Sequence, residues 1–112
     1  MSDCLFCKIA AGEIPANKLY EDDKCLAFYD IAPQAPVHFL VIPKAHLASV
    51  SSVNKDNAAL VGHIMTVIAQ LTNKLMLGSY RVVSNVGGQA GQSVFHLHFH
   101  VLGGRDMTWP PG

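Results

Sequence analysis

Three histidines alternate with large apolar residues in the segment 95–104, close to the end of the chain. Strict alternation predicts a strand that carries His96, His98 and His100 on one face and apolar side chains on the other. Same-face neighbours on a strand lie roughly 7 Å apart, so the outer two histidines are separated by about 13 Å and a single metal ion cannot bind all three. At least one imidazole is therefore available for nucleophilic or acid–base chemistry near neutral pH.

A neutral imidazole can attack phosphorus or an acyl carbon and form a covalent intermediate. Such a nucleophile needs an acceptor that orients its other ring nitrogen, donors for the developing negative charge and an acid for the leaving group. A second histidine of the row can reach the same phosphate, and Asn85, Gln92 and Ser93 are neutral donors nearby. The sequence contains no Gly-x4-Gly-Lys-[Ser/Thr] loop, no legible Ser-His-Asp pattern and no acidic cluster for paired metal ions.

A glycine-rich segment, residues 86–92, directly precedes the histidine row. Gly87, Gly88 and Gly91 permit positive φ and close backbone approach, as a loop that cradles an anion requires. Such a segment is also typical of a simple flexible turn. Its position beside the histidines favours the anion-binding role.

Cys4 and Cys7 have the spacing of half a tetrahedral zinc site, although two reduced thiols that pack as small apolar groups are the alternative. Three cysteines do not suggest a disulfide framework. Cys25 is predicted to be a packed thiol, and His63 a packed or partly exposed histidine. Histidines that could complete a zinc site are His38, His46, His63 and the members of the row.

Composition restricts the class of protein further. With 112 residues, 50% hydrophobic and 14% charged, the chain is predicted to be one globular domain, residues 1–112, with some apolar surface left for a partner subunit. The formal net charge of +0 and the absence of charged runs favour neither nucleic acid nor anionic membrane as a partner. Residues 1–4 lack the basic and apolar parts of an export signal, and no segment approaches a membrane span of about 20 apolar residues. These features predict a cytoplasmic protein.

The elements that must position the histidines follow from periodicity and from turn residues. A short helix capped by Asp3 is expected over residues 4–11, and one long helix over 56–76. Strands are expected over residues 18–21, 25–29, 38–42, 80–85 and 93–102. This order predicts an α+β domain whose five-stranded, mostly antiparallel sheet is covered on one face by the long helix.

The histidine row also resembles a known signature. The segment His96-Leu-His98-Phe-His100-Val-Leu fits the His-φ-His-φ-His-φ-φ motif, where φ is apolar, of the histidine triad (HIT) superfamily of nucleotide hydrolases and transferases. Segments 28–31, 35–44, 80–85, 91–95 and 102–112, which ends in Trp109-Pro-Pro-Gly112, resemble the branch called histidine triad nucleotide-binding proteins, or Hint. That branch consists of homodimeric purine nucleoside phosphoramidases. They cleave the P–N bond of nucleoside 5′-phosphoramidates and of nucleotidyl amines or lysines.

The resemblance implies a role for each matching residue. His98 would be the nucleophile that forms a nucleotidyl-histidine, His100 would contact the α-phosphate and assist proton delivery, and His38 would support the nucleophile from behind. Asp30 would bind the ribose hydroxyls, and Trp109 would complete the active site of the partner subunit. The phosphate and leaving group would be held by Asn85, Gly91, Gln92 and Ser93. The walls around the base would be Phe6, Ile9, Ile14, Phe28, Ile31 and Leu40.

The cysteine pair distinguishes this chain from many animal members, which have non-ligand residues there. Some bacterial members, and the related galactose-1-phosphate uridylyltransferases, carry zinc on two cysteines, a distant histidine and the first histidine of the motif. The resemblance therefore implies a structural Zn²⁺ that pins the N-terminal helix to the sheet, and a bacterial source. The implied ligands are Cys4, Cys7, His46 and His96.

Three other functions are compatible with the residues. A dinucleoside polyphosphate hydrolase of the same superfamily would use the same row, although the ending Trp109-Pro-Pro-Gly112 disfavours it. A purine-nucleotide-binding regulatory module with incidental catalysis would need the same pocket. A zinc hydrolase would use the histidine row itself as its metal ligands.

Overall fold

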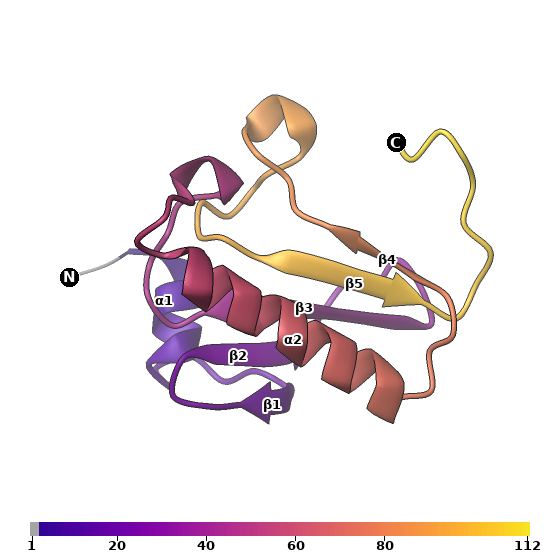
Figure 1. Ribbon diagram of the computed structural model, residues 1–112, viewed down its shortest axis with the longest axis horizontal. Helices are drawn as coiled ribbons and strands as arrows, with labels where there is room; N and C mark the ends of the chain where they lie inside the picture. Colours follow the sequence, from indigo (N-terminus) through magenta and orange to yellow (C-terminus); the bar gives the residue numbers. More distant parts are fainter. Residues whose placement is uncertain (1–2) are drawn as a thin grey trace.

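The computed structural model describes residues 3–112. Met1 and Ser2, the first part of the segment in which no export signal was expected, lie outside the described residues. Five strands form one sheet: β1 (Lys18–Glu21), β2 (Cys25–Tyr29), β3 (Val37–Pro43), β4 (Tyr80–Val83) and β5 (Phe99–Gly103). Their order across the sheet is β1-β2-β3-β5-β4, and every neighbouring pair is antiparallel (Figure 1). The predicted five-stranded α+β architecture is confirmed.

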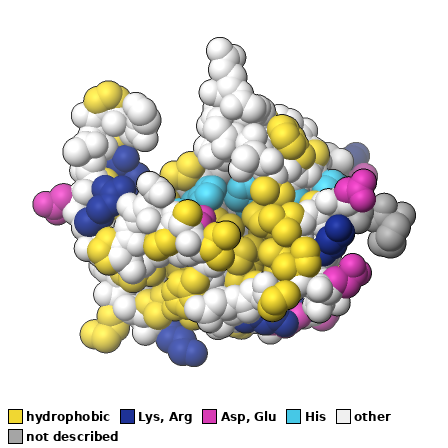
Figure 2. Space-filling view, turned by 180° about the vertical axis from the view of Figure 1, so that it is seen from behind, with side chains coloured by type: hydrophobic (Ala, Val, Ile, Leu, Met, Phe, Trp, Pro, Cys, Tyr) yellow, Lys and Arg dark blue, Asp and Glu magenta, His cyan; other side chains and the backbone are white. Residues whose placement is uncertain are grey.

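Two helices lie on opposite sides of this sheet (Figure 1). The long helix α2 (Ala58–Lys74) crosses one face, and the short helix α1 (Leu5–Ala10) lies behind the other. Two 3₁₀ turns, η1 (Val50–Ser52) and η2 (Gly88–Ala90), lie in the connecting loops. Seen from the face away from α2, histidine side chains form a row above an apolar surface (Figure 2). Within residues 3–112, no helix combines the length and the apolar character that a membrane span requires.

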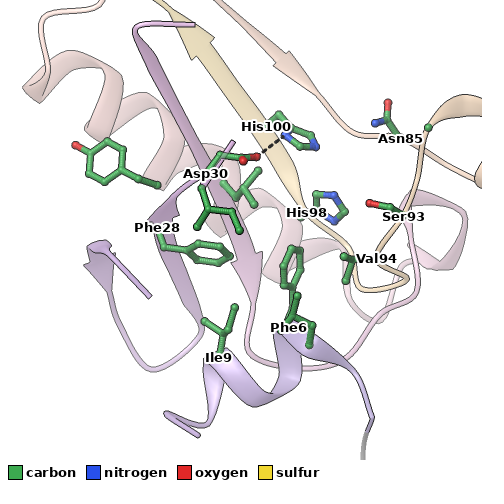
Figure 3. Close-up of a pocket in the computed structure, with 14 residues that line it drawn as sticks. Phe6, Ile9, Phe28, Asp30, Asn85, Ser93, Val94, His98 and His100 are labelled. Atoms are coloured by element: carbon green, nitrogen blue, oxygen red, sulfur yellow. Dashed lines mark ion pairs between the residues drawn. The ribbon is translucent and has the colours of Figure 1, made fainter. Parts of the chain in front are cut away.

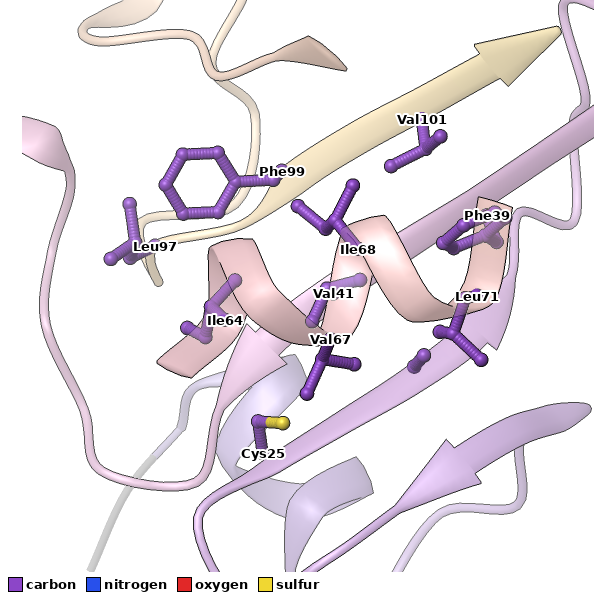
Figure 4. Close-up of a cluster of buried hydrophobic side chains, with 11 residues drawn as sticks. Cys25, Phe39, Val41, Ile64, Val67, Ile68, Leu71, Leu97, Phe99 and Val101 are labelled. Atoms are coloured by element: carbon purple, nitrogen blue, oxygen red, sulfur yellow. The ribbon is translucent and has the colours of Figure 1, made fainter. Parts of the chain in front are cut away.

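Strand β3 is buried on both faces, which explains its uninterrupted apolar sequence. Phe39 and Val41 face α2, and they pack with Ile64, Val67 and other side chains in the larger buried cluster (Figure 4). The alternate residues of the strand face α1 and join Phe6 and Ile9 in a second cluster. The sheet therefore has a core on each side, and the α1 side is the smaller.

We expect Ile64→Ala to lower the free energy of unfolding by about 2–5 kcal/mol, because the side chain is 0% exposed and its loss leaves a cavity against the sheet. Urea unfolding at pH 7 measures the change. Met65→Ala, one position along α2 at a side chain 39% exposed, is the matched control. Equal losses in the two variants would contradict the burial of Ile64.

The histidine strand is shorter than predicted. Strand β5 begins at Phe99, so the prediction of a strand from residue 93 was wrong for residues 93–98. The physical reason is a lack of partners, because β3 pairs with β5 only as far as Val41 opposite Phe99. Beyond that point the Pro43 carbonyl accepts a bond from the His96 ring, and Leu97 N–H donates to the Leu47 carbonyl. The expected alternation still holds, since Leu97 and Phe99 enter the α2-side core while His98 and His100 face the other side.

Other boundaries also differ. Strand β4 ends two residues early, at Val83. Helix α1 is capped by Cys4, whose Sγ accepts from the Cys7 N–H at 3.4 Å, rather than by Asp3. Helix α2 begins at Ala58 because the Asn54 side chain holds residues 54–57 in a turn by accepting two backbone N–H bonds.

Candidate active site and metal centre

A cavity of about 390 Å³ opens on the α1 side of the sheet (Figure 3). One end is apolar, and there Phe6 meets Phe28 edge to face with ring centroids 5.5 Å apart. Phe6 also lies edge-on to His98, at 5.1 Å. The other end is polar. It is formed by Asp30, Asn85, Gly91, Ser93, His98 and His100. An apolar slot with a few convergent polar groups is typical of a small-molecule site.

The hydrogen bonds of His98 determine which ring nitrogen carries the proton. Nδ1 lies 2.7 Å from the backbone carbonyl oxygen of His96, and a carbonyl can only accept. Nδ1 is therefore the donor, and the neutral ring leaves Nε2 with a lone pair. Because His98 lines the cavity, this lone pair is the candidate nucleophile.

The tautomer of His100 follows from a longer chain of bonds. The backbone N–H of Gln34 donates to His38 Nδ1 at 3.0 Å, so the proton of a neutral His38 is on Nε2. That N–H faces His100 Nδ1 at 2.9 Å and donates to it, which leaves the His100 proton on Nε2. Asp30 Oδ2 lies near both rings: it is 3.5 Å from His38 Nε2 and 3.9 Å from His100 Nδ1. Figure 3 shows the Asp30–His100 pair. His38 thus supports His100, and not His98 as predicted.

The two active-site histidines therefore present opposite hydrogen-bonding groups. His98 offers an unprotonated Nε2 and His100 an Nε2–H, and their ring centroids are 5.0 Å apart. Burial, and then the neighbouring His98 and His38, lower the pKa of His100 to about 4. Burial also lowers the pKa of His38. Both rings are neutral at pH 7, as the bond chain requires.

Folding stability should fall as the pH drops from about 6.5 to about 4, because the unfolded chain takes up a proton on His100 in this range before the folded chain does. Above pH 6.5 this contribution is complete. One such group adds a slope of at most about 1.4 kcal/mol per pH unit. Urea unfolding at several pH values gives the free energy of unfolding as a function of pH. This plot should have a shallower slope for His100→Gln than for the wild type, and protonation of His38 and His96 accounts for the slope that remains. An unchanged slope would contradict the assignment.

A second cluster lies at the start of α1, where Cys4, Cys7, His46 and His96 bring four ligand atoms within 4.8 Å of one another. His96 Nδ1 lies 3.4 Å from Cys4 Sγ, 3.5 Å from Cys7 Sγ and 3.2 Å from His46 Nδ1. His46 Nδ1 is 3.3 Å from Cys7 Sγ. The edges of a tetrahedral zinc site are about 3.3 Å between two nitrogens and about 3.6 Å between nitrogen and sulfur.

The donor chemistry of this cluster also fits a metal. His96 Nε2 lies 2.8 Å from the Pro43 carbonyl oxygen and so carries the proton, which turns the Nδ1 lone pair toward the two sulfurs. Two sulfurs and two imidazole nitrogens are typical ligands of structural zinc. The predicted set of four residues could therefore hold Zn²⁺, and it leaves His98 and His100 free for other chemistry.

Known proteins share both the sequence and this fold. The family model described as "Scavenger mRNA decapping enzyme C-term binding" matches residues 3–109. A HIT-like protein of Synechococcus elongatus is 51% identical over 111 residues, which cover 98% of this chain and 97% of that protein. The chain belongs to the histidine triad family.

Solved structures of histidine triad proteins agree closely with this one. A HIT family hydrolase from Legionella pneumophila superimposes with a TM-score of 0.94 at 51% identity, covering 98% of this chain and 100% of that one. A histidine triad protein from Clostridium difficile has a TM-score of 0.92 at 44% identity, with 96% of each chain covered. The fold and the family therefore rest on whole-chain similarity.

Most residues expected to contact substrate in this histidine triad protein line the cavity beside His98 and His100. Ile31 is fully exposed at its edge, and Gly91 adopts a φ of +97° that favours glycine. The expected residues that the structure brings together are Phe6, Ile9, Phe28, Asp30, Ile31, Leu40, Asn85, Gly91, Ser93, His98 and His100.

Gln92 differs from its predicted role at the phosphate. Its Oε1 accepts from the Gly87 N–H at 2.8 Å, and its Nε2 donates to the carbonyls of Ala48 and Val94. Its backbone N–H donates to the Gly87 carbonyl. Gln92 is buried and shapes the glycine-rich loop instead of facing the cavity.

Two further expected residues lie outside the cavity. Ile14 packs beside the α1-side cluster. Trp109 is 81% exposed, and the Arg81 guanidinium of β4 lies 5.7 Å from the centre of its ring. Sequence reasoning missed the lining residues Leu5, Tyr29 and Val94. Each is the immediate neighbour of a predicted lining residue, and this adjacency was the available signal.

Proposed function

We propose that this histidine triad protein is a hydrolase of the Hint branch that cleaves the P–N bond of purine nucleoside 5′-phosphoramidates. The observation that carries the proposal is the pair of opposite tautomers at one cavity, a lone pair on His98 Nε2 beside an N–H on His100 Nε2. Nucleophile and acid are the two groups that displacement of an amine from phosphorus requires. HIT family hydrolases among the similar structures support the reaction class.

The substrate binds along the length of the cavity, with the base at the apolar end and the phosphate at the polar end. The purine lies at the apolar end against the wall that Phe6 and Phe28 form together, and the ribose hydroxyls bond to the Asp30 carboxylate. The α-phosphate then reaches the polar end. There its oxygens accept from the neutral donors Asn85 and Ser93, next to the two histidines.

The reaction proceeds in two displacements at phosphorus. His98 Nε2 attacks the phosphorus and forms a P–N bond to the enzyme, while the bond to the substrate nitrogen breaks. The departing nitrogen takes the proton from His100 Nε2 and leaves as a neutral amine. The negative charge left on the His100 ring is balanced by the positive charge on the phosphorylated His98 ring beside it, and the His38 Nε2–H stabilises it. Water then attacks the phosphorus and gives a proton back to His100 Nε2. His98 departs with its lone pair, and the nucleoside monophosphate is released.

The proposal includes a resident Zn²⁺ and a second copy of the chain. Zinc on Cys4, Cys7, His46 and His96 would supply a closed structural cross-link between α1 and the segment before β5. Ligand thiols must stay reduced, which agrees with a cytoplasmic location. A homodimer is supported by the edge strand β4, where Tyr80 and Val82 are 39% and 42% exposed, and by the exposed Trp109.

Turnover of adenosine 5′-phosphoramidate, followed by amine release, tests this function. We expect faster hydrolysis of this substrate than of diadenosine triphosphate, which the polyphosphate-hydrolase alternative would favour. Guanosine 5′-phosphoramidate in a parallel series gives the base preference. Absence of turnover of both phosphoramidates, or a preference for the dinucleotide, would refute the proposal.

A further inference from the structure

The segment that follows β5 lies against the loop before β3, where Gly104 approaches Pro36 and Arg105 bonds to Gln34. Gly104 makes the close approach possible, because its φ is +91° and a Cβ atom there would lie 3.0 Å from Cβ of Pro36. The next residue, Arg105, donates from Nε to the backbone carbonyl of Gln34 at 3.0 Å. A charged donor on a carbonyl is stronger than a neutral one. This exposed arginine therefore holds the loop at Gln34.

The same loop residue determines the protonation pattern at the active site. Gln34 donates its backbone N–H to His38 Nδ1, and its side chain donates to the Ala32 carbonyl at 3.0 Å. Ala32 in turn donates its N–H to Asp30 Oδ1 at 2.8 Å. The loop is thus a compact turn whose inner end touches His38 and whose outer end is bound by Arg105.

We propose that Arg105 is a positioning residue that fixes the tautomer of His100 through Gln34 and His38. The relay contains three hydrogen bonds: Arg105 to the Gln34 carbonyl at 3.0 Å, Gln34 N–H to His38 at 3.0 Å, and His38 to His100 at 2.9 Å. The catalytic part of the proposal rests on the proposed function, whereas the tautomer part does not.

Once the Gln34 N–H moves away, His38 Nδ1 no longer has a donor that excludes a proton from it. The Asp30 carboxylate, 3.5 Å from Nε2, still favours a proton there, so both tautomers of His38 become populated. The His38 side chain is 4% exposed, so water does not readily replace the Gln34 donor. With the proton on Nδ1, His38 Nε2 becomes an acceptor and His100 must donate from Nδ1. His100 then presents a lone pair to the cavity, and the leaving nitrogen has no proton to take.

Arg105 does not line the cavity, so its effect on the reaction must pass through this relay. A residue that only positions an acid should change kcat and leave substrate binding almost unaltered. General acids contribute roughly 10²-fold or more to rate. Because loss of Arg105 would leave a mixture of tautomers, we expect a smaller effect, with kcat reduced about 10-fold in Arg105→Met and KM within about twofold of the wild type.

Nitrogen-15 NMR of the histidine rings tests the tautomer directly and needs no substrate. In the full-length wild type, the His100 signals should report a proton on Nε2, and Arg105→Met should convert them to those of a tautomer mixture. Arg105→Lys, which keeps a charged donor, should restore the wild-type pattern in large part. Arg81→Met is the matched control for loosening of the C-terminal segment, because Arg81 bonds the Thr108 carbonyl and not the loop. Its His100 signals should stay as in the wild type.

The outcomes separate this proposal from the proposed function. Unchanged His100 signals in Arg105→Met, or an equal change in Arg81→Met, would overturn the positioning role. Altered signals with an unaltered kcat would overturn its catalytic consequence. Altered signals in a protein that hydrolyses no phosphoramidate would uphold the tautomer relay and refute the function.

Discussion

His98→Ala is expected to lower phosphoramidate turnover by at least about 10³-fold, because the variant has no nucleophile and only the binding and donor groups remain. The single lone pair that the hydrogen bonds leave facing the cavity beside His100 belongs to His98 Nε2. The neighbouring His100 presents an N–H and not a lone pair to the cavity. Initial rates measure the loss. Intact-protein mass spectrometry during turnover should detect a nucleotidyl adduct on the wild type and none on the variant.

The variant should still bind the nucleotide, since the apolar wall around Phe6 and Phe28 does not depend on the imidazole. Adenosine monophosphate titrated into His98→Ala should bind within about tenfold of the wild-type affinity, which separates loss of chemistry from loss of fold. His63→Ala is the control histidine variant. His63 bonds to Asp22 at 2.6 Å, away from the cavity. A nucleotidyl adduct that persists in His98→Ala would assign the nucleophile to another residue.

The double variant Cys4→Ser/Cys7→Ser is expected to lose one bound Zn²⁺ per chain and much of the stability that the ion provides. An ion that binds only the folded state, at a free concentration 1,000 times its Kd, stabilises it by about 4 kcal/mol. Thermal unfolding of the wild type with and without a chelator should show this difference, and the double variant should respond to neither chelator nor added zinc. Elemental analysis gives the stoichiometry.

Zinc content measured in single histidine variants tests which histidines bind the metal. His46→Ala and His96→Ala should reduce zinc content, whereas His98→Ala and His100→Ala should retain one ion per chain. Cys25→Ala removes a thiol at 0% exposure outside the cluster, so it should keep full zinc content and controls for the loss of a cysteine. Zinc lost with His98 and His100 would support the zinc-hydrolase alternative instead.

Side-chain patterns predicted the parts of this protein that depend on apolar burial. The uninterrupted apolar sequence of β3 predicted burial on both faces, and β3 contributes side chains to both buried clusters. The alternation of Leu97, Phe99 and Val101 predicted one buried face, and all three side chains lie in the cluster on the α2 side. The same alternation predicted a β5 that was too long. A strand continues only where the neighbouring strand has a backbone N–H and a carbonyl to pair with, and Pro43 of β3 has only a carbonyl, which bonds to the His96 ring.

The protonation pattern at the histidines had no signal in the sequence. The His96 carbonyl sets the tautomer of His98, and the Gln34 N–H sets that of His38. Every residue other than proline carries such groups, so their positions follow only from the folded chain. Gln92 gave a misleading signal in the sequence. Its polar side chain is adjacent to the predicted phosphate-binding residues, but it bonds to backbone groups of Gly87 and Ala48 instead of facing the cavity.

Helix α1 is six residues long and belongs to two sites at once. Cys7 belongs to the metal cluster, while Phe6 and Ile9 form part of the wall around the base. With the proposed zinc bound, we expect substitutions at these positions to be coupled. If zinc binds there as proposed, a lineage that loses one ligand cysteine would also lose the metal that holds the aromatic wall in place, and the other cysteine would no longer be under selection as a ligand. Relatives without the pair should therefore lack both cysteines, and they should carry larger apolar residues where α1 meets the sheet.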